Sequence, residues 1–196
     1  MSGNIREARD YSDIAGRELL LGVCGGIAAY KAAALTSLAR KAGLGVTVVM
    51  TEAATKLVAP KTFEALSGRP VATTMWGANL AHPHIELARQ ADVFCVAPAT
   101  ANTMAKAAAG FADNLLTSTI LAFVGTPIYA PAMNAAMWSK PATQRNVRRL
   151  VEDGALIVGP ETGSFSCGEA GVGRMAEPEA IFDVVVRELR RRASAV

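Results

Sequence analysis

The segment Ala130–Trp138, with the sequence APAMNAAMW, combines a carboxamide with two thioethers. Asn134 offers both a hydrogen-bond donor and an acceptor, while Met133 and Met137 offer soft apolar surface that can pack on a flat ligand. The segment follows a strand-like run, Thr126–Ala130, and open α/β sheets bind ligands at the carboxyl ends of their strands. We therefore predict a ligand site with Asn134 as its polar contact. An asparagine here can equally cap a following helix.

A second site signal is the glycine-rich turn 22–28, GVCGGIA, between a predicted strand and a predicted helix. Gly25 and Gly26 allow close backbone approach, and the helix that begins at Ile27 and Ala28 would offer amides to an anion. The turn lacks the G-x-G-x-x-G spacing of dinucleotide folds, and Thr51 ends the second strand where such folds carry an acidic residue. This pattern favours a mononucleotide over NAD. A tight turn without a ligand is the alternative.

The third predicted strand is followed by small and hydroxylic residues, PATAN at 98–102. The parallel arrangement would bring this loop to the same sheet edge as the glycine turn. Its residues Pro98, Ala99, Thr100 and Asn102 are therefore further candidates for nucleotide contacts.

Two titratable side chains stand out, and one of them, His84, is a candidate for proton transfer. His84 stands in HPHIEL (82–87) shortly before the third strand, at a strand-edge position, and histidine titrates near neutral pH. Cys167 lies in a glycine-rich run, and we predict that residues 164–175 form a mobile loop. Each has an ordinary alternative, a surface histidine and a small buried thiol. The His-x-His pair has no third ligand nearby, so we predict no metal.

Composition limits the class of protein. Hydrophobic residues make up 51% of the 196 residues and charged ones 19%, so we expect neighbouring subunits to cover part of the surface. Three separated cysteines argue against a disulfide framework and for the reducing cytoplasm. No apolar run is long enough to cross a membrane. Arginines near 145–149 and 187–192 lack interleaved aromatics, so we expect no nucleic-acid partner.

The periodicity alternates strand and helix. Expected strands are 18–24, 46–50, 91–96, 128–130 and 155–158, and expected helices are 27–42, 61–66, 102–109, 114–123, 143–152 and 178–192. This order predicts one α/β domain, residues 18–196, with a doubly wound, Rossmann- or flavodoxin-like, mostly parallel sheet and helices on both faces. Residues 1–17 are polar and read as a flexible N-terminal extension.

Several separated motifs together resemble one family. They are GGIAAYK (25–31), MTEA (50–53), HIEL (84–87), APATAN (97–102), AGFADNL (109–115), PAMN (131–134) and CGEAGVGRM (167–175). In this order the chain, from residue 19 to the C-terminal helix, resembles the homo-oligomeric flavin-containing cysteine decarboxylases. Within that family the similarity is greatest to the members that act on phosphopantothenoylcysteine in coenzyme A biosynthesis.

The resemblance implies a cofactor and roles for named residues. FMN would be held by the glycine loop (Gly25, Gly26, Ile27, Ala28), Thr51, the loop with Pro98, Ala99, Thr100 and Asn102, and Asn114. His84 matches the family's active-site histidine, and Cys167 matches the cysteine of a loop that closes over the substrate. Asn134 would contact the substrate carboxylate, beside Ala132, Met133 and Met137.

It also implies an assembly and partners. Family members form trimers, often four trimers together as a dodecamer, with FMN at subunit interfaces. The bacterial enzymes are commonly fused to the synthetase that makes their substrate. Because this sequence has no such domain, a separate phosphopantothenoylcysteine synthetase is a possible partner.

The implied reaction explains why these groups are needed. A cysteinyl carboxylate loses carbon dioxide slowly, because the electrons left at Cα have no acceptor. Oxidation of the thiol to a thioaldehyde supplies that acceptor, decarboxylation then gives an enethiolate, and the flavin returns the electrons to form the saturated thiol. His84 would serve as base or electrostatic partner, Asn134 would hold the carboxylate, and Cys167 would be the final acid.

Three other functions share parts of the pattern. A peptidyl-cysteine decarboxylase of peptide natural-product maturation has the His84 and Asn134 motifs but stops at the enethiol, and the segment 167–175 argues against it. A flavin prenyltransferase shares the fold and uses FMN as substrate, but would not combine PAMN with the loop cysteine. A regulatory binding protein of this fold would carry long acidic extensions.

Overall fold

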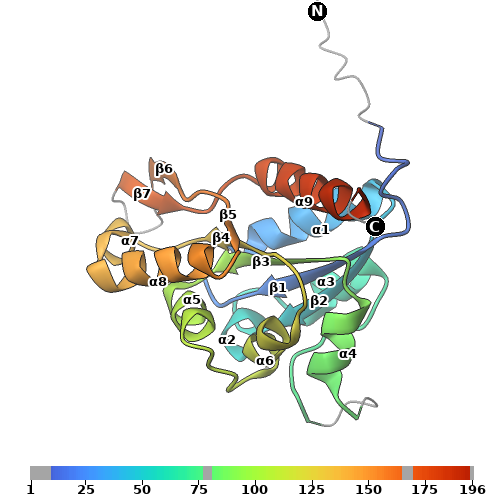
Figure 1. The fold of residues 1–196 in the computed structure, drawn as a ribbon, viewed down its shortest axis with the longest axis horizontal. Coiled ribbons are helices and arrows are strands. Elements are labelled where there is room, and N and C mark those ends of the chain that lie inside the picture. Colours follow the sequence, from blue (N-terminus) through green and yellow to red (C-terminus); the bar gives the residue numbers. More distant parts are fainter. Residues whose placement is uncertain (1–9, 77–80, 165–169, 195–196) are drawn as a thin grey trace, which may run out of the picture.

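The computed structural model describes residues 10–76, 81–164 and 170–194. Its main sheet has five parallel strands in the order β2-β1-β3-β4-β5. The strands are β1 (Glu18–Val23), β2 (Gly45–Met50), β3 (Val93–Ala99), β4 (Pro127–Pro131) and β5 (Leu156–Ile157). This is the strand order of flavodoxin-like doubly wound folds, so the predicted fold class is confirmed (Figure 1).

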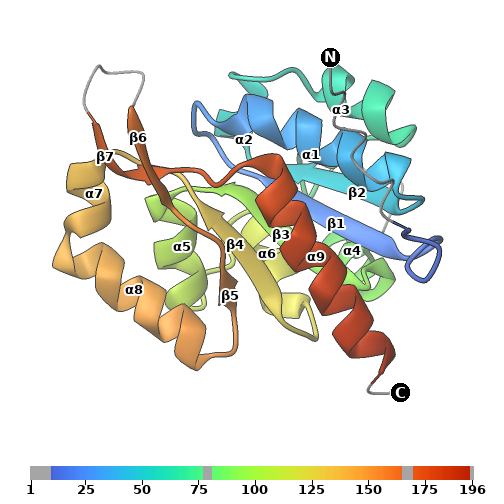
Figure 2. The ribbon, with the colours of Figure 1, turned by 90° about the horizontal axis from the view of Figure 1, so that it is seen from above.

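Helices cover both faces of the sheet (Figures 1 and 2). One face carries α1 (Ala29–Lys41), α9 (Pro178–Ala193) and, packed against α1 and β2, α3 (Pro60–Ser67). The other face carries α4 (Pro83–Gln90), α5 (Ala101–Ala108), α6 (Leu115–Ala122) and α8 (Pro141–Glu152). Two short helices, α2 (Glu52–Thr55) and α7 (Ala135–Ser139), directly follow β2 and β4.

Each face has its own apolar core, and β1 shows how the sequence divides between them. Leu19 and Leu21 pack into the core beneath α1 and α9, whereas Leu20 packs into the core beneath α5 and α6. Successive strand side chains point to opposite faces, and each fully buried leucine contributes roughly 1.5–3 kcal/mol. Gly22 faces α6 so closely that an added Cβ would lie 2.6 Å from Leu116 Cδ1. A larger residue would therefore push α6 away from the sheet.

The predicted elements are confirmed in type and order, with a few local corrections. His84, expected at a strand edge, lies in the first turn of α4. Pro98 and Ala99, expected in a loop, are the last two residues of β3 and are buried. The short helices α2 and α7 have only four and five residues, too few for a helical period to show in the sequence.

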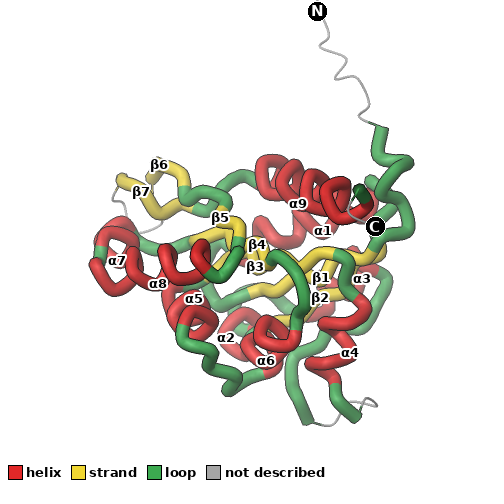
Figure 3. Tube along the Cα trace, viewed as in Figure 1, coloured by secondary structure: helices red, strands yellow, loops and turns green. Residues whose placement is uncertain are grey.

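The expected loop 164–175 is largely a β-hairpin. Strands β6 (Glu161–Ser164) and β7 (Ala170–Arg174) pair antiparallel and form a second sheet. Figure 3 shows this pair beyond the edge of the main sheet, with β7 near α7. Cys167, between the two strands, lies outside the described residues.

The N-terminal segment that the structure describes packs on α9. Ile14 is 2% exposed, and the Tyr11 ring meets the Phe182 ring edge-on at 5.5 Å between centroids. Arg190 donates two hydrogen bonds to Asp13, at 2.7 and 3.0 Å. Residues 10–17, which the sequence placed in a flexible extension, therefore pack on the folded domain; residues 1–9 of that predicted extension lie outside the described residues.

No helix within the described ranges is long and apolar enough to span a membrane.

Candidate functional site

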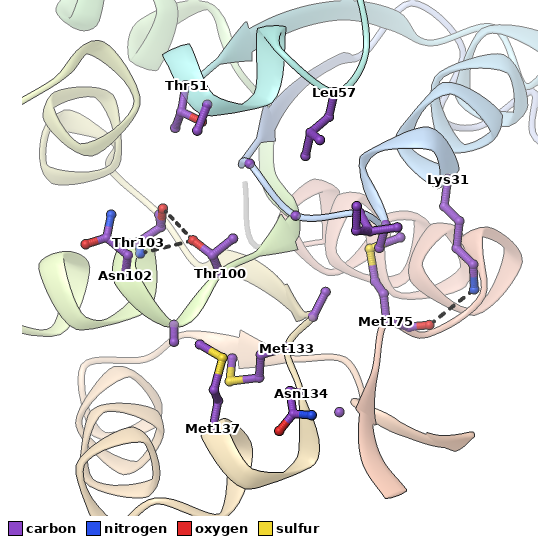
Figure 4. A pocket seen from close by; sticks show the side chains of 18 of the residues that line it. Lys31, Thr51, Leu57, Thr100, Asn102, Thr103, Met133, Asn134, Met137 and Met175 are labelled. Carbon is purple, nitrogen blue, oxygen red and sulfur yellow. Dashed lines mark hydrogen bonds between the residues drawn. The ribbon is translucent and has the colours of Figure 1, made fainter. Parts of the chain in front are cut away.

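A cavity of about 1430 Å³ opens at the carboxyl ends of β1 to β4 (Figure 4). It is larger than most small-molecule pockets, which measure roughly 300–1,000 Å³. Twelve of the residues predicted for cofactor or substrate line it: Gly25, Gly26, Ile27, Ala28, Thr51, Thr100, Asn102, Asn114, Ala132, Met133, Asn134 and Met137. The fold thus brings five separate segments of the sequence together at one place.

Four of these residues are helix N-caps, whose side-chain oxygens accept hydrogen bonds from backbone amides. They are Thr51 of α2, Thr100 of α5, Asn114 of α6 and Asn134 of α7, at O···N distances of 3.3, 3.3, 3.1 and 2.7 Å. A helix N-terminus carries partial positive charge and favours anions. The cavity therefore lies where the positive ends of several helices converge.

Helix α1 also begins at the cavity, but no side chain caps its N-terminus. Its N-cap residue, Ala28, makes no side-chain capping bond, and the first turn holds no acidic residue. The amides of Ala29 and Lys31 donate to the carbonyls of Gly26 and Ala28, both at 2.9 Å, and the other amides of this end can bond water or an anionic ligand. This end of α1 is the most suitable place in the cavity for a phosphate.

The two glycines of the turn differ in how closely other residues pack around them. A Cβ on Gly25 would lie 2.4 Å from Ala53 Cβ, so α2 packs directly on that glycine. A Cβ on Gly26 would meet Thr100 Cγ2 at 3.6 Å, an ordinary contact. Gly25 is thus required by the protein's own packing, whereas Gly26 leaves room on the cavity side.

A chain of hydroxyl and thiol groups lies under the cavity. The Cys24 thiol is 3.2 Å from Thr103 Oγ1, which is 3.3 Å from Thr100 Oγ1. Burial raises the pKa of Cys24, against the lowering effect of its hydrogen bonds to Thr103 and Thr100. The thiol therefore stays protonated. Thr103 lines the cavity, yet we did not predict it from sequence, although its position three residues after a helix-capping threonine was a usable signal.

Asn134 both caps α7 and lines the cavity, so the two interpretations of this residue are compatible. Its carboxamide oxygen accepts from Ala136 N, and the carboxamide also carries an NH₂ donor group. Figure 4 shows Met133 and Met137 beside it on the same side of the cavity. Met133 N donates to Gly173 O at 3.0 Å, which joins this loop to the β6–β7 hairpin.

The opposite end of the cavity is charged. Lys31 of α1 donates to Glu177 Oε1 at 3.0 Å and to the Met175 carbonyl at 3.4 Å, and Arg174 bonds the same carboxylate oxygen. The hydrogen bond from Lys31 holds the pKa of Glu177 below its ordinary value. All four residues line the cavity, and none was predicted as a site residue, because their meeting depends on contacts distant in sequence.

Three predicted residues lie elsewhere. Pro98 and Ala99 are buried in β3 and are not part of the cavity lining. His84 is half-buried on α4, outside the lining, and its buried Nδ1 has no hydrogen-bond partner among the described residues. Within the described part of the chain, no three His, Cys, Asp or Glu side chains are grouped as metal ligands would be.

Known proteins resemble this chain along most of its length. The coenzyme A biosynthesis bifunctional protein CoaBC of Vibrio cholerae is 47% identical over 167 residues, which are 84% of this chain and 42% of that protein. The protein of the same name from Bacillus subtilis is 44% identical over 183 residues, 91% of this chain and 45% of that protein. The chain therefore spans less than half the length of these curated relatives.

Solved structures share the whole fold. The FMN-dependent cysteine decarboxylase SpaF is 38% identical, with a TM-score of 0.78 over 92% of this chain and 99% of that one. A cysteine-to-serine mutant of PPC decarboxylase complexed with pantothenoylaminoethenethiol is 33% identical, with a TM-score of 0.78 over 87% and 96% of the two chains. The flavoprotein family model matches residues 7–190. This chain belongs to the flavoprotein family.

Proposed function

We propose that this protein binds FMN in the cavity and decarboxylates 4'-phosphopantothenoylcysteine to 4'-phosphopantetheine, a step of coenzyme A biosynthesis. The observation that carries the proposal is the meeting of the α1 N-terminus, which no side chain caps, with the Asn134 loop in one cavity. Relatives named CoaBC and PPC decarboxylase support the choice of substrate. We place the reaction in the cytoplasm, because a thiol substrate needs a reducing compartment.

The residues of the cavity fit a flavin mononucleotide. The end of α1 beside Gly26, which no side chain caps, suits a phosphate. The hydroxyl and amide groups of Thr51, Thr100, Asn102 and Asn114 suit the polyol chain and the polar ring edge of the flavin. Leu57 and the two methionines supply apolar surface for a flat ring. Bound FMN would supply the two-electron oxidation of the substrate thiol and the later return of those electrons.

The chain's own residues would orient the substrate and move its protons. The Asn134 carboxamide is a donor suited to the substrate carboxylate, held in place because its oxygen is fixed by the α7 cap. Met133 and Met137 would exclude water from the reacting carbons. His84 would take the thiol proton, and Cys167 would protonate the enethiolate carbon that receives no hydride.

For His84 to act, a neighbouring subunit has to supply it, since it is outside the lining of its own chain's cavity. We infer a homotrimer, or a dodecamer of four trimers, with FMN at the subunit contacts. Exposed apolar side chains at or near the cavity support an interface there: Ile27 is 63% exposed, Tyr30 62% and Phe111 61%. We expect no nucleic acid, membrane or metal to take part.

One experiment tests both the reaction and the shared site. The purified protein should release FMN on denaturation and convert phosphopantothenoylcysteine to a product lighter by one carbon dioxide. His84→Asn and Asn134→Ala should each be inactive, and their mixed oligomers should regain about a quarter of wild-type turnover, as sites built from two subunits predict. No turnover by the wild type would refute the reaction, and inactive mixtures would refute the shared site.

Replacement of Cys167 tests the final proton transfer. Cys167→Ser should still decarboxylate but should accumulate the enethiol, because a serine hydroxyl is a far weaker acid than a thiol. A relative's cysteine-to-serine mutant was solved with pantothenoylaminoethenethiol, in line with this outcome. Release of saturated product at the wild-type rate would remove Cys167 from the mechanism.

The similarity to SpaF, an FMN-dependent cysteine decarboxylase, supports a cysteine as the group that is decarboxylated, and the second candidate function is decarboxylation of a peptidyl cysteine. A peptide with a C-terminal cysteine, offered beside phosphopantothenoylcysteine, separates the two functions by which one is consumed. The bifunctional relatives also support a separate synthetase as partner of this chain. Faster product formation when such a synthetase supplies the substrate directly would support that association.

A further inference from the structure

A group of three charged side chains, Lys31, Glu177 and Arg174, joins three elements at one end of the cavity. We call it the charged tie. Lys31 lies in the first turn of α1, Arg174 ends β7, and Glu177 is the N-cap residue of α9. The Glu177 carboxylate accepts from Lys31 Nζ at 3.0 Å and from Arg174. Two cations therefore share one carboxylate.

Lys31 stands where a cation is unfavourable for its own helix. The positive end of the helix dipole repels a lysine in the first turn, and that turn holds no acidic residue to offset it. The side chain is also only 11% exposed, so it has lost most of its hydration. Its contacts with Glu177 and the Met175 carbonyl compensate for both costs, which indicates that Lys31 acts through those two partners.

Arg174 is oriented by the hairpin. Its guanidinium lies 3.8 Å from Glu161, its partner in the β6–β7 register. Its side chain crosses Gly163 so closely that a Cβ there would lie 2.9 Å from Arg174 Cδ. The hairpin thus holds Arg174 in place, and Glu177 links that held side chain to α1.

The backbone between these contacts forms one wall of the cavity. Gly173, Arg174 and Met175 all line it. The Met175 carbonyl accepts from Lys31, and the Gly173 carbonyl accepts from Met133 N, next to Asn134. Residues 173–175 are therefore held on one side by the helix that starts at the glycine turn and on the other by the Asn134 loop.

We propose that the charged tie positions this wall over the substrate part of the cavity, with Lys31 and Glu177 as positioning residues for substrate binding. The inference rests on the proposed function for its substrate and names residues that hold the wall rather than touch the reacting atoms. Loss of the tie would loosen residues 173–175 and their hold on the Asn134 loop. The glycine turn and the caps that face the cofactor would be unaffected.

The test uses Lys31→Met, Glu177→Gln, their double variant and Lys31→Arg in the full-length, FMN-loaded protein. Lys61→Met is the matched control, since Lys61 forms an exposed ion pair with Glu64 at 3.0 Å outside the cavity lining. We expect Lys31→Met to raise KM for phosphopantothenoylcysteine about tenfold with kcat and flavin affinity nearly unchanged, the effect of one lost charge-assisted contact. Lys31→Arg should restore most of the loss.

The double variant should be no worse than the worse single variant, because groups that act as one unit are not additive. Additive effects, or a lower melting temperature and flavin loss without a change in KM, would overturn the proposal in favour of a purely structural role. Hydrogen exchange at the amides of residues 173–175 gives a readout without turnover. It should be faster in Lys31→Met than in Lys61→Met, and equal rates would refute the tie even if the proposed substrate were wrong.

Discussion

The two walls of the cavity are built in different ways. On the sheet-edge wall, the four capping side chains of Thr51, Thr100, Asn114 and Asn134 are each fixed within three residues in the sequence, as when Thr100 Oγ1 accepts from Thr103 N or Asn134 Oδ1 accepts from Ala136 N. The hairpin wall consists of residues 173–175. Contacts that are distant in sequence hold it in place, such as Lys31 with Glu177 and Gly173 with Met133. Local caps form with their helices, whereas the hairpin wall exists only after the whole domain has folded. The first wall should therefore tolerate changes in the second.

The largest expected effect separates the two roles of Asn134 on the sheet-edge wall. Asn134→Ala removes both the cap and the carboxamide, so we expect about 1 kcal/mol lower stability and roughly 100-fold lower turnover. Asn134→Asp keeps a capping oxygen but loses the NH₂ donor and repels a carboxylate. It should recover stability and not activity, as measured by thermal unfolding and carbon dioxide release. Full activity of the aspartate variant would contradict the carboxylate contact.

The glycine pair gives the next largest effect. Gly25→Ala places a methyl group 2.4 Å from Ala53 Cβ, and overpacking of this kind costs about 1–3 kcal/mol. At about 2–4 °C per kcal/mol, calorimetry should show a clear fall in Tm together with weaker FMN retention. Gly26→Ala is the control for Tm alone, since its methyl group meets only ordinary protein contacts. An equal fall in Tm in the two variants would refute the packing role given to Gly25.

A smaller effect is expected from the hairpin wall. Gly163→Ala puts a Cβ 2.9 Å from Arg174 Cδ, which the flexible arginine can relieve by moving away from Glu177. We expect KM to rise about threefold, less than for loss of Lys31, because a displaced cation weakens the contact without removing it. Flavin content should not change. Loss of flavin in steady-state fluorescence would show that the two walls are not separable.

The smallest effect concerns pH. Because the hydrogen bond from Lys31 lowers the pKa of Glu177 in the folded protein, the contact is complete above the ordinary glutamate value of about 4.3. It is lost only as pH falls through the lowered pKa. KM, measured in the wild type between neutral pH and about pH 5, should therefore show no contribution from Glu177. A rise in KM over that window that is absent in Glu177→Gln would contradict the assignment.

The same contrast explains what the sequence could predict. Thr51, Thr100 and Asn134 could be selected because they follow predicted parallel strands, whose carboxyl ends meet at one edge of a sheet, and Asn114 because it precedes a helix with a recognisable period. The hairpin could not be predicted, since glycines at 163, 171 and 173 hide the alternation that marks a strand. The partners of Lys31 could not be identified either, because Glu177 is 146 positions away.

His84 shows a further limit. Its residue type and motif made it a candidate, but whether it faces the cavity of its own chain depends on where helix α4 lies in the fold, which a local pattern does not specify. Pro98 and Ala99 were chosen with their neighbours because the end of the third strand was placed three residues too early, at 96; β3 extends to Ala99. An error of this size changes which residues are assigned to the cavity, because the buried strand β3 is followed directly by residues that line it.

The docking of residues 10–17 on α9 bears on how the chain can be rearranged. Arg190 binds both Asp13 and the Asp10 carbonyl, one helical turn before Ser194. The two ends of the described chain are therefore neighbours, and a short linker could join them. New ends opened at the exposed turn around Gly154, between α8 and β5, would give a circular permutant in which every residue of the cavity lining keeps its local sequence.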